Sequence, residues 1–283
     1  MFHRLNDARV VADPFPHVVI DEFLEGGLAD ELVRQMPPLS TLTGGAALGS
    51  NARFTLGAAA ALAAPAVPPV WKQVVGEGLT QGFLNRVVGL FDPFIRSEFP
   101  DFATRFADPA NLAAVPRHAP ERPRGSVGLD AQISGNTPAL TGGTTVRGPH
   151  LDRTDKLFVG LLYLRLDGDD SRGGDLELYE SADRVPAFAP KRLLPRDRVR
   201  LVKVVPYRRN TLVLFLNTPR ALHGVSPRAA TPHPRCFLNL VGEMPRPVFE
   251  VRCQDPVPVT AAATPATRGL LRRAWDGIVR RSA

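Results

Sequence analysis

The chain has 283 residues, of which 44% are hydrophobic and 22% charged, a composition typical of folded globular proteins. Its 28 prolines and 24 glycines suit many short strands joined by turns better than a helical bundle. The net charge of +7 is compatible with a nucleic-acid or membrane partner. However, the arginines are spread along the chain rather than clustered, which disfavours nucleic acid as a partner.

Two features bear on the compartment. Only Cys236 and Cys253 are present, which fits a reducing environment and no disulfide framework. The first residues are charged and contain no apolar core, so we expect no secretory signal. The longest apolar stretch, 57–70, is mostly alanine and proline and is too short to span a bilayer. We therefore expect a cytoplasmic protein without a transmembrane segment, and its oligomeric state stays open.

The pattern of the first 125 residues indicates that they pack against a core formed by later residues and do not form a core of their own. In chain order the patterns indicate a short strand at 17–20, a helix at 25–36, a long loop at 39–69, a helical region from Trp71 onward, and a linker or irregular wrap at 105–125. Pro93 is expected to break or kink the second helical region. The aromatic stripe of that region is interpreted as packing against a sheet.

From Ser126 onward the pattern changes to repeated short runs rich in β-formers. These runs are 126–134, 157–165, 174–180, 199–205, 211–216, 222–225 and 236–241. Together with the segment that leads into His150, they predict two facing antiparallel sheets. The expected fold is mainly β with flanking α-helices, a double-stranded β-helix (a jelly-roll, cupin-like core) buttressed by the N-terminal helices.

Three parts of the chain are predicted. Residues 1–125 form the helical and irregular support, and residues 126–255 form the core. Residues 256–283 form a linker and a basic amphipathic helix, which could dock on its own domain or lie on a membrane surface.

The most informative motif is His150-Leu-Asp152, with His223 far along the chain. In an extended strand residues i and i+2 point to the same side, so His150 and Asp152 can face one point. A second imidazole would complete two histidines and one carboxylate, the ligand set of non-haem Fe(II) oxygenases. His3, His17, His118 and His233 have no partner at metal-ligand spacing and are interpreted as surface or packing residues.

The segments around this motif strengthen it. After it come an apolar strand ending in Tyr163-Leu, then Gly173-Gly-Asp-Leu, then a strand leading to His223, and then Arg235 before a further strand. This order resembles the 2-oxoglutarate- and Fe(II)-dependent dioxygenases, specifically the branch similar to prolyl 4-hydroxylases. The resemblance covers roughly 126–244.

The resemblance implies roles for five residues. His150, Asp152 and His223 would be the metal ligands and the catalytic centre. Arg235, with Tyr163 beside it, would bind the distal carboxylate of 2-oxoglutarate, since arginine offers a bidentate, permanently charged partner. Arg228 is the alternative arginine, but it lies in a turn where a guanidinium would more naturally meet solvent. The implied cofactors are Fe(II), 2-oxoglutarate and O₂, with ascorbate as a candidate reductant.

One departure from the family concerns the segment before the motif. Prolyl hydroxylases usually carry Tyr-x-x-Gly there, whereas 136–145 contains no tyrosine. Gln132 is a candidate substitute, and the departure weakens a prolyl-peptide assignment. Arg147 is a second candidate substrate-binding residue; it could instead pair with Asp155 or Asp170.

The expected activity is therefore oxidative. Asp152 is retained where halogenating relatives carry a small residue, which favours hydroxylation of a small-molecule or peptidyl substrate. Val241 stands where nucleic-acid demethylating relatives carry a second arginine, which disfavours that branch. The alternative is a non-oxygenase jelly-roll that binds a metal or another ligand.

Overall fold

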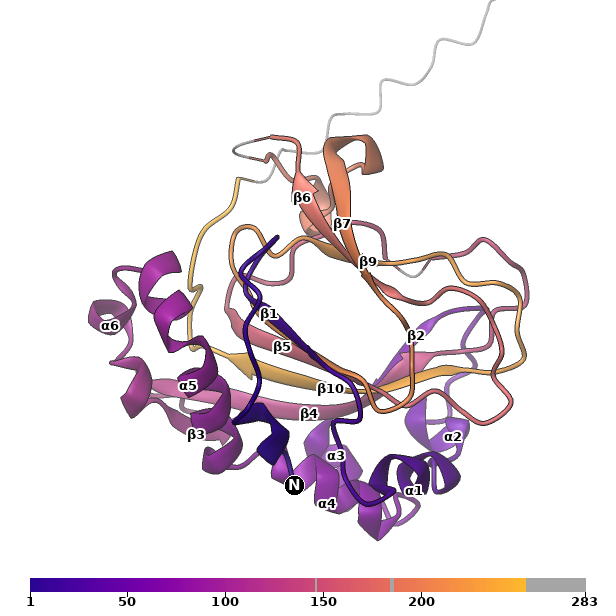
Figure 1. Cartoon of the computed structure of the whole chain (residues 1–283). Coiled ribbons are helices and arrows are strands. Elements are labelled where there is room, and N and C mark those ends of the chain that lie inside the picture. Colours follow the sequence, from indigo (N-terminus) through magenta and orange to yellow (C-terminus); the bar gives the residue numbers. More distant parts are fainter. Residues whose placement is uncertain (146, 184–185, 253–283) are drawn as a thin grey trace, which may run out of the picture.

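The protein is described here by a computed structural model that covers residues 1–145, 147–183 and 186–252. Two β-sheets face each other, and helices cover the outer face of the larger one (Figure 1). The strands are β1 (His17–Ile20), β2 (Arg53–Leu56), β3 (Ala113–Pro116), β4 (Ser126–Asn136), β5 (Lys156–Tyr163), β6 (Leu176–Ser181), β7 (Val199–Val205), β8 (Leu212–Leu216), β9 (His223–Val225) and β10 (Arg235–Glu243).

The larger sheet has the order β1-β8-β5-β10-β4-β2, with β3 paired to β4 in parallel. The pairs along the main order are antiparallel. The smaller sheet has the order β7-β6-β9. It is extended at β9 by His150, which exchanges two backbone hydrogen bonds of 2.9 and 3.0 Å with His223.

The chain alternates between the sheets. From β4 in the larger sheet it passes through His150 in the smaller one, returns to β5, and continues through β6 and β7 to β8, β9 and β10. This alternation is the jelly-roll, or double-stranded β-helix, and the fold prediction is confirmed. Strands from the first 125 residues also join the larger sheet. The division of the chain at residue 125 stays a prediction.

The helices are α1 (Leu28–Arg34), α2 (Leu39–Leu42), α3 (Ala58–Ala63), α4 (Pro69–Glu77), α5 (Gln81–Glu98) and α6 (Phe102–Arg105). Helix α5 buries one apolar face, and its Phe83 packs edge-on against Phe158 of β5 with ring centroids 5.9 Å apart. Helix α4 buries Trp71, whose indole N–H donates to the Leu32 carbonyl at 3.0 Å. The interpretation of the aromatic stripe as packing is therefore confirmed.

One sequence prediction was wrong in this region, and the expectation that Pro93 breaks or kinks its helix was wrong as to the break. The expected loop at 39–69 contains α2, β2 and α3, because 58–63 is almost pure alanine and β2 completes the hydrogen bonding of the β4 edge. Pro93 does not break α5, which runs on to Glu98. The burial of both flanks of this helix, at Phe91 and Ile95, outweighs the one hydrogen bond that proline removes.

Two further expectations meet the structure only in part. The irregular segment 105–125 contains β3. The predicted helix within 256–283 lies outside the described residues. Among the residues that are described, no helix is both long enough and apolar enough to cross a membrane.

Candidate active site

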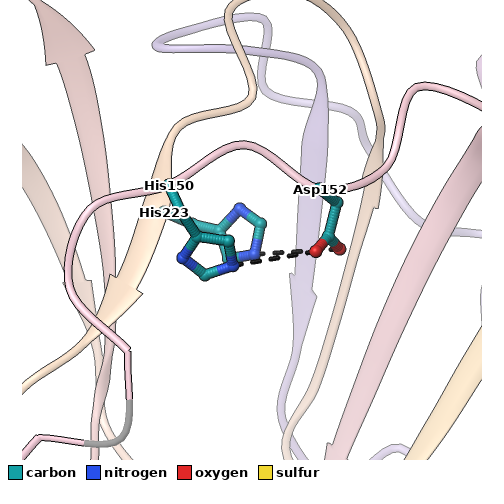
Figure 2. A group of neighbouring side chains, drawn as sticks. All are labelled: His150, Asp152 and His223. Carbon is teal, nitrogen blue, oxygen red and sulfur yellow. Dashed lines mark ion pairs between the residues drawn. The ribbon is translucent and has the colours of Figure 1, made fainter. Parts of the chain in front are cut away.

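An isolated β-bridge at the edge of the smaller sheet brings His150 next to His223 of β9. Their imidazole centroids are 4.2 Å apart, and Asp152 faces both rings (Figure 2). The Nε2 atoms of His150 and His223 lie 3.7 and 3.9 Å from the two carboxylate oxygens of Asp152. Within the described part of the chain this is the group of histidine and acidic side chains whose ligand atoms all lie within 4.8 Å of one another.

The backbone fixes the tautomer of each histidine. Nδ1 of His150 donates to the Gly148 carbonyl and Nδ1 of His223 donates to the Ala221 carbonyl, each at 2.9 Å. The Nε2 atom of each ring is therefore the one with a free lone pair, and it points at Asp152. Burial lowers the pKa of both imidazoles, and that of His223 falls to about 3. Both rings are neutral at physiological pH, as metal ligands must be.

Asp152 is held as a carboxylate. Burial by itself would raise its pKa, but the nearby Lys156 ammonium holds the pKa well below its ordinary value. The Lys156 ammonium donates to Oδ2 at 3.0 Å, and Nη1 of Arg147 lies 3.7 Å from Oδ1. Supporting contacts of this kind fix the orientation of a carboxylate that binds a metal.

The donor set fits a divalent metal. Two neutral imidazole nitrogens and one carboxylate, all buried, are what non-haem Fe(II) sites use. Metal–ligand bonds of about 2.0–2.2 Å place two ligand atoms at most about 4.4 Å apart. The two nitrogen–oxygen distances lie within this limit, so the three side chains need only small adjustments to share one ion.

Strand register places a polar row on the inner face of the larger sheet. Residues that are paired directly across antiparallel strands share a face. Arg235 of β10 pairs with Asn136 of β4, and Phe237 pairs with Tyr163 of β5. Because alternate residues of β10 point inward, Arg235 and Phe237 share that face, and Asn136 and Tyr163 share it with them.

Arg235 is buried among aromatic rings. It is 1% exposed, and its guanidinium carbon lies 5.0, 5.1 and 4.9 Å from the ring centroids of Tyr163, Tyr207 and Phe237. Its Nε donates to the Gly174 carbonyl at 2.6 Å, whereas its Nη2 has no hydrogen-bond partner. Among the described residues no carboxylate pairs with it. A buried cation in this state calls for an anion from outside the chain.

Two more buried polar atoms on this face have no partner. The hydroxyl of Tyr163, which is 0% exposed, makes no hydrogen bond to any residue that the structure describes, and neither does Nδ2 of Asn136. Burial raises the pKa of Tyr163, while nearby Arg235 acts to lower it. The tyrosine is therefore a neutral hydroxyl that can donate. Orphaned buried donors are rare in folded proteins, so three of them on one face indicate a missing acceptor.

The turn at Gly173 and Gly174 explains how the Arg235 side chain is held in position. Gly173 has a φ of +79°, and a Cβ there would lie 1.9 Å from the Pro227 carbonyl oxygen. Gly174 also has a φ of +79°, and a Cβ there would lie 3.1 Å from Cδ of Arg235. Only glycine allows this turn to approach closely enough for the Gly174 carbonyl to accept from Arg235.

The expectation that Arg228 meets solvent was wrong. Arg228 is 2% exposed, and its guanidinium donates to Asn51 Oδ1 at 3.1 Å, to the Thr137 carbonyl at 3.1 Å and to the His233 carbonyl at 2.9 Å. It ties the turn that carries it to the segment before β2 and to the end of β4. Both of its terminal nitrogens are used, unlike those of Arg235.

The two candidate substrate-binding residues, Gln132 and Arg147, differ in how fully their polar atoms are already hydrogen-bonded. Gln132 lies inside the barrel with both ends engaged: its amide donates to Asp130 at 2.6 Å and accepts from Asn239 at 2.7 Å. Arg147 is half-buried and donates to the Lys191 carbonyl at 3.0 Å. It forms its ion pair with Asp152, whereas Asp155 pairs with Arg153.

Sequence reasoning missed four residues of this region. Lys156 follows the H-x-D motif closely enough to have been noticed, but a lysine at the start of a strand is usually solvated. Asn136, Tyr207 and Arg53 carry no motif and reach the site only through strand register and packing.

Comparisons with known proteins give structural neighbours only. No family model matches the chain, and no curated protein matches its sequence. A prolyl-4-hydroxylase from Pseudomonas putida is 15% identical, with 81% of this chain and 92% of that chain covered and a TM-score of 0.45. A 2OG-Fe(II) oxygenase family protein from Caulobacter crescentus is 15% identical, with 81% and 78% covered and a TM-score of 0.43.

A third neighbour is HygX from Streptomyces hygroscopicus, solved with nickel and 2-oxoglutarate bound. It is 15% identical, with 81% of this chain and 83% of that chain covered and a TM-score of 0.41. The chain is thus similar in structure to prolyl 4-hydroxylases and to other 2-oxoglutarate- and Fe(II)-dependent oxygenases.

Proposed function

We propose that this protein is a 2-oxoglutarate- and Fe(II)-dependent oxygenase, most simply a hydroxylase. The observation that carries the proposal is that the two facing sheets bring two complementary features to the barrel interior. His150, Asp152 and His223 offer a metal site, and Arg235 and Tyr163 offer buried donors without an acceptor. A jelly-roll that only bound a metal would have no use for the second feature.

In this proposal His150, Asp152 and His223 hold Fe(II). Arg235 binds the distal carboxylate of 2-oxoglutarate through its unpaired Nη2, and Tyr163 donates its hydroxyl to the same carboxylate. Asn136 offers a third donor from the adjacent strand. The metal, when bound with O₂, supplies the oxidation of a C–H bond coupled to decarboxylation of 2-oxoglutarate to succinate.

The remaining residues position and protect this chemistry. Lys156 holds the carboxylate of Asp152 in place, and the Gly148 and Ala221 carbonyls hold the two imidazoles. Phe215 packs against His223 with ring centroids 4.8 Å apart and keeps water from that side of the site. A small-molecule or peptidyl substrate, ascorbate as a reductant and a cytoplasmic location belong to the same proposal. Cys236, buried as a free thiol, is in keeping with a reducing compartment.

The test uses binding before turnover, because the substrate is unknown. Protein loaded with Ni(II), a redox-silent substitute for Fe(II), is titrated with 2-oxoglutarate by calorimetry. We expect metal-dependent binding that is lost in His150→Ala, Asp152→Ala and His223→Ala. The exposed His118 makes no side-chain hydrogen bond within the described residues, so His118→Ala is the matched control.

Turnover is measured next, as succinate released with Fe(II) and O₂ in a screen of metabolites, sugar derivatives, amino acids and peptides. The oxygenase proposal is wrong if metal-loaded wild-type protein fails to bind 2-oxoglutarate. In that case the alternative, a barrel that binds a metal or another ligand, takes its place.

A further inference from the structure

Arg53 is an arginine of the barrel interior to which the cofactor chemistry assigns no role. It begins β2, the edge strand of the larger sheet, and pairs directly with Asn136 of β4. Asn136 pairs in turn with Arg235 of β10. Since directly paired residues share a face, Arg53 points into the barrel on the same row as Arg235.

The side chain reaches well into the interior. Its guanidinium carbon lies 4.7 Å from the ring centroid of Phe237, the same ring that Arg235 approaches to 4.9 Å. Its Nε makes one long hydrogen bond, 3.4 Å to Oγ1 of Thr55. The two terminal nitrogens make no hydrogen bond within the described residues, and no carboxylate there pairs with them.

The Arg53 side chain is exposed to solvent but is also closely surrounded by protein atoms. The residue is exposed to solvent, yet burial, followed by repulsion from Arg235, lowers its pKa to about 10. The side chain can therefore be reached by a solute while it packs among protein atoms. The lowered pKa still leaves Arg53 charged at physiological pH.

Two arginines near the opposite end of β10, beside Glu243, have an acidic partner. Arg117 pairs with Glu243 at 2.8 Å, and Arg122 pairs with the same carboxylate at 3.3 Å. Asp130 accepts from the Ala58 N–H at 2.9 Å and from Gln132. These two carboxylates are therefore engaged, whereas no carboxylate of the described residues pairs with Arg53.

Arg53 comes from a different strand than the residues of the proposed cosubstrate pocket, although it adjoins them at Phe237. Arg235, Tyr163 and Asn136 already supply three donors there without its help. Arg53 approaches from a strand two places away from β10, about 10 Å across the sheet. On the metal side it shares the interior with Arg147, which is half-buried beside Asp152.

We propose that Arg53 binds an oxyanion carried by the oxidised substrate, a carboxylate or a phosphate monoester. This inference rests on the oxygenase function proposed above and narrows it to anionic substrates. A guanidinium forms two parallel hydrogen bonds with either group. Arg147, at the mouth of the same interior, adds a second positive charge that attracts such a molecule.

The test measures anion binding to the protein already loaded with Ni(II) and saturated with 2-oxoglutarate. The probes are sodium acetate and sodium methyl phosphate, each exchanged for sodium chloride at constant ionic strength, with thermal stability as the readout. We expect saturable stabilisation of the wild type by one probe. Arg53→Gln should weaken that binding by about 10- to 100-fold, and Arg53→Lys, which keeps the charge, should weaken it less.

Arg208→Gln is the matched control. Arg208 is 65% exposed and pairs with Asp21 at 3.7 Å, outside the barrel, so its variant should bind both probes as the wild type does. Preference for acetate identifies a carboxylate, and preference for methyl phosphate identifies a phosphate monoester.

Three results overturn the inference. They are no saturable binding by the wild type, equal binding by Arg53→Gln, and a loss of 2-oxoglutarate affinity in Arg53→Gln, which would place Arg53 in the cosubstrate pocket. None of these three results contradicts the oxygenase proposal. That proposal fails only if the metal-loaded wild type does not bind 2-oxoglutarate in the first step of the same experiment.

Discussion

The guanidinium carbon of Arg235 lies 5.0 Å from the centre of the Tyr163 ring, and each of the two side chains carries a buried polar atom without a hydrogen-bond partner. Leaving such an atom unsatisfied costs about 1–3 kcal/mol. A chain that keeps two of them side by side gives up stability in its ligand-free state. A carboxylate between them would satisfy both atoms. This is the physical reason for placing the distal carboxylate of the cosubstrate there.

Tyr163→Phe separates this explanation from simple packing. The hydroxyl has no partner in the ligand-free protein, so its removal should leave thermal stability unchanged or slightly raised. Affinity for 2-oxoglutarate should fall by about tenfold, because one hydrogen bond to a charged group is lost. Calorimetric titration and thermal unfolding of the same preparations measure the two effects.

Tyr207→Phe is the comparison for Tyr163. The hydroxyl of Tyr207 accepts from the Cys236 N–H at 2.8 Å, so this variant should lose stability even without ligand. If Tyr163→Phe behaves in the same way, its hydroxyl has a structural role that the unpaired atom does not show.

Lys156→Met tests how Asp152 is positioned. The ammonium donates to the carboxylate at 3.0 Å, and its loss should weaken Ni(II) binding by about 10- to 100-fold, the usual effect of removing such a supporting contact. The fold should persist, because methionine preserves most of the aliphatic length. Lys72→Met on α4 should bind the metal normally, because this lysine forms no ion pair or side-chain hydrogen bond within the described part of the chain. Unchanged metal affinity in Lys156→Met would show that Asp152 is held by other means.

The sequence predicted the jelly-roll because short runs rich in β-formers follow one another, separated by turn residues. Seven β-rich runs from 126 onward correspond to β4 through β10. The H-x-D motif and the distal histidine could be recognised because extended backbone fixes which side chains share a face. Local rules of this kind need no knowledge of the rest of the molecule.

What could not be predicted depends on long-range packing. Arg228 appeared to belong to an exposed turn, yet partners at Asn51, Thr137 and His233 bury it. Arg53 lay within an expected loop and gained its position from the pairing of β2 with β4. In each case the decisive contact joins residues remote in sequence, where composition and periodicity carry no signal.

His17 predicts a pH dependence of stability. The ring is fully buried, donates from Nδ1 to the Phe15 carbonyl at 2.8 Å and lies 3.2 Å from the Lys203 ammonium. Burial lowers its pKa below 6.5 in the folded protein. The unfolded chain therefore binds a proton there more readily, and folding loses stability as the pH falls below about 6.5.

His17→Gln isolates this contribution. The variant should be less stable than the wild type near pH 8, and the difference should shrink by up to about 1.4 kcal/mol for each pH unit below 6.5. Urea unfolding at a series of pH values measures it. A difference that stays constant with pH would mean that the folded and unfolded chains protonate His17 alike.

The choice between Arg235 and Arg228 gives the most discriminating pair of variants. Both guanidiniums are buried, but only that of Arg235 keeps an unpaired terminal nitrogen. Arg235→Gln should therefore raise the Kd for 2-oxoglutarate by two orders of magnitude or more, since a charged bidentate contact is worth several kcal/mol. Its effect on the ligand-free protein should be small, because it breaks a single hydrogen bond to Gly174.

Arg228→Gln should show the opposite pattern. It removes three hydrogen bonds and leaves two buried carbonyls without that donor, at a cost of about 3 kcal/mol, or roughly 5–10 °C in Tm. Its Kd for 2-oxoglutarate, measured well below that Tm, should stay within a few fold of the wild type. Because the two variants make the same chemical change at neighbouring buried arginines, general loss of structure cannot produce both results. If the affinity loss follows Arg228 instead, the cosubstrate carboxylate lies on the other side of the turn after β9, and Arg235 is the structural residue.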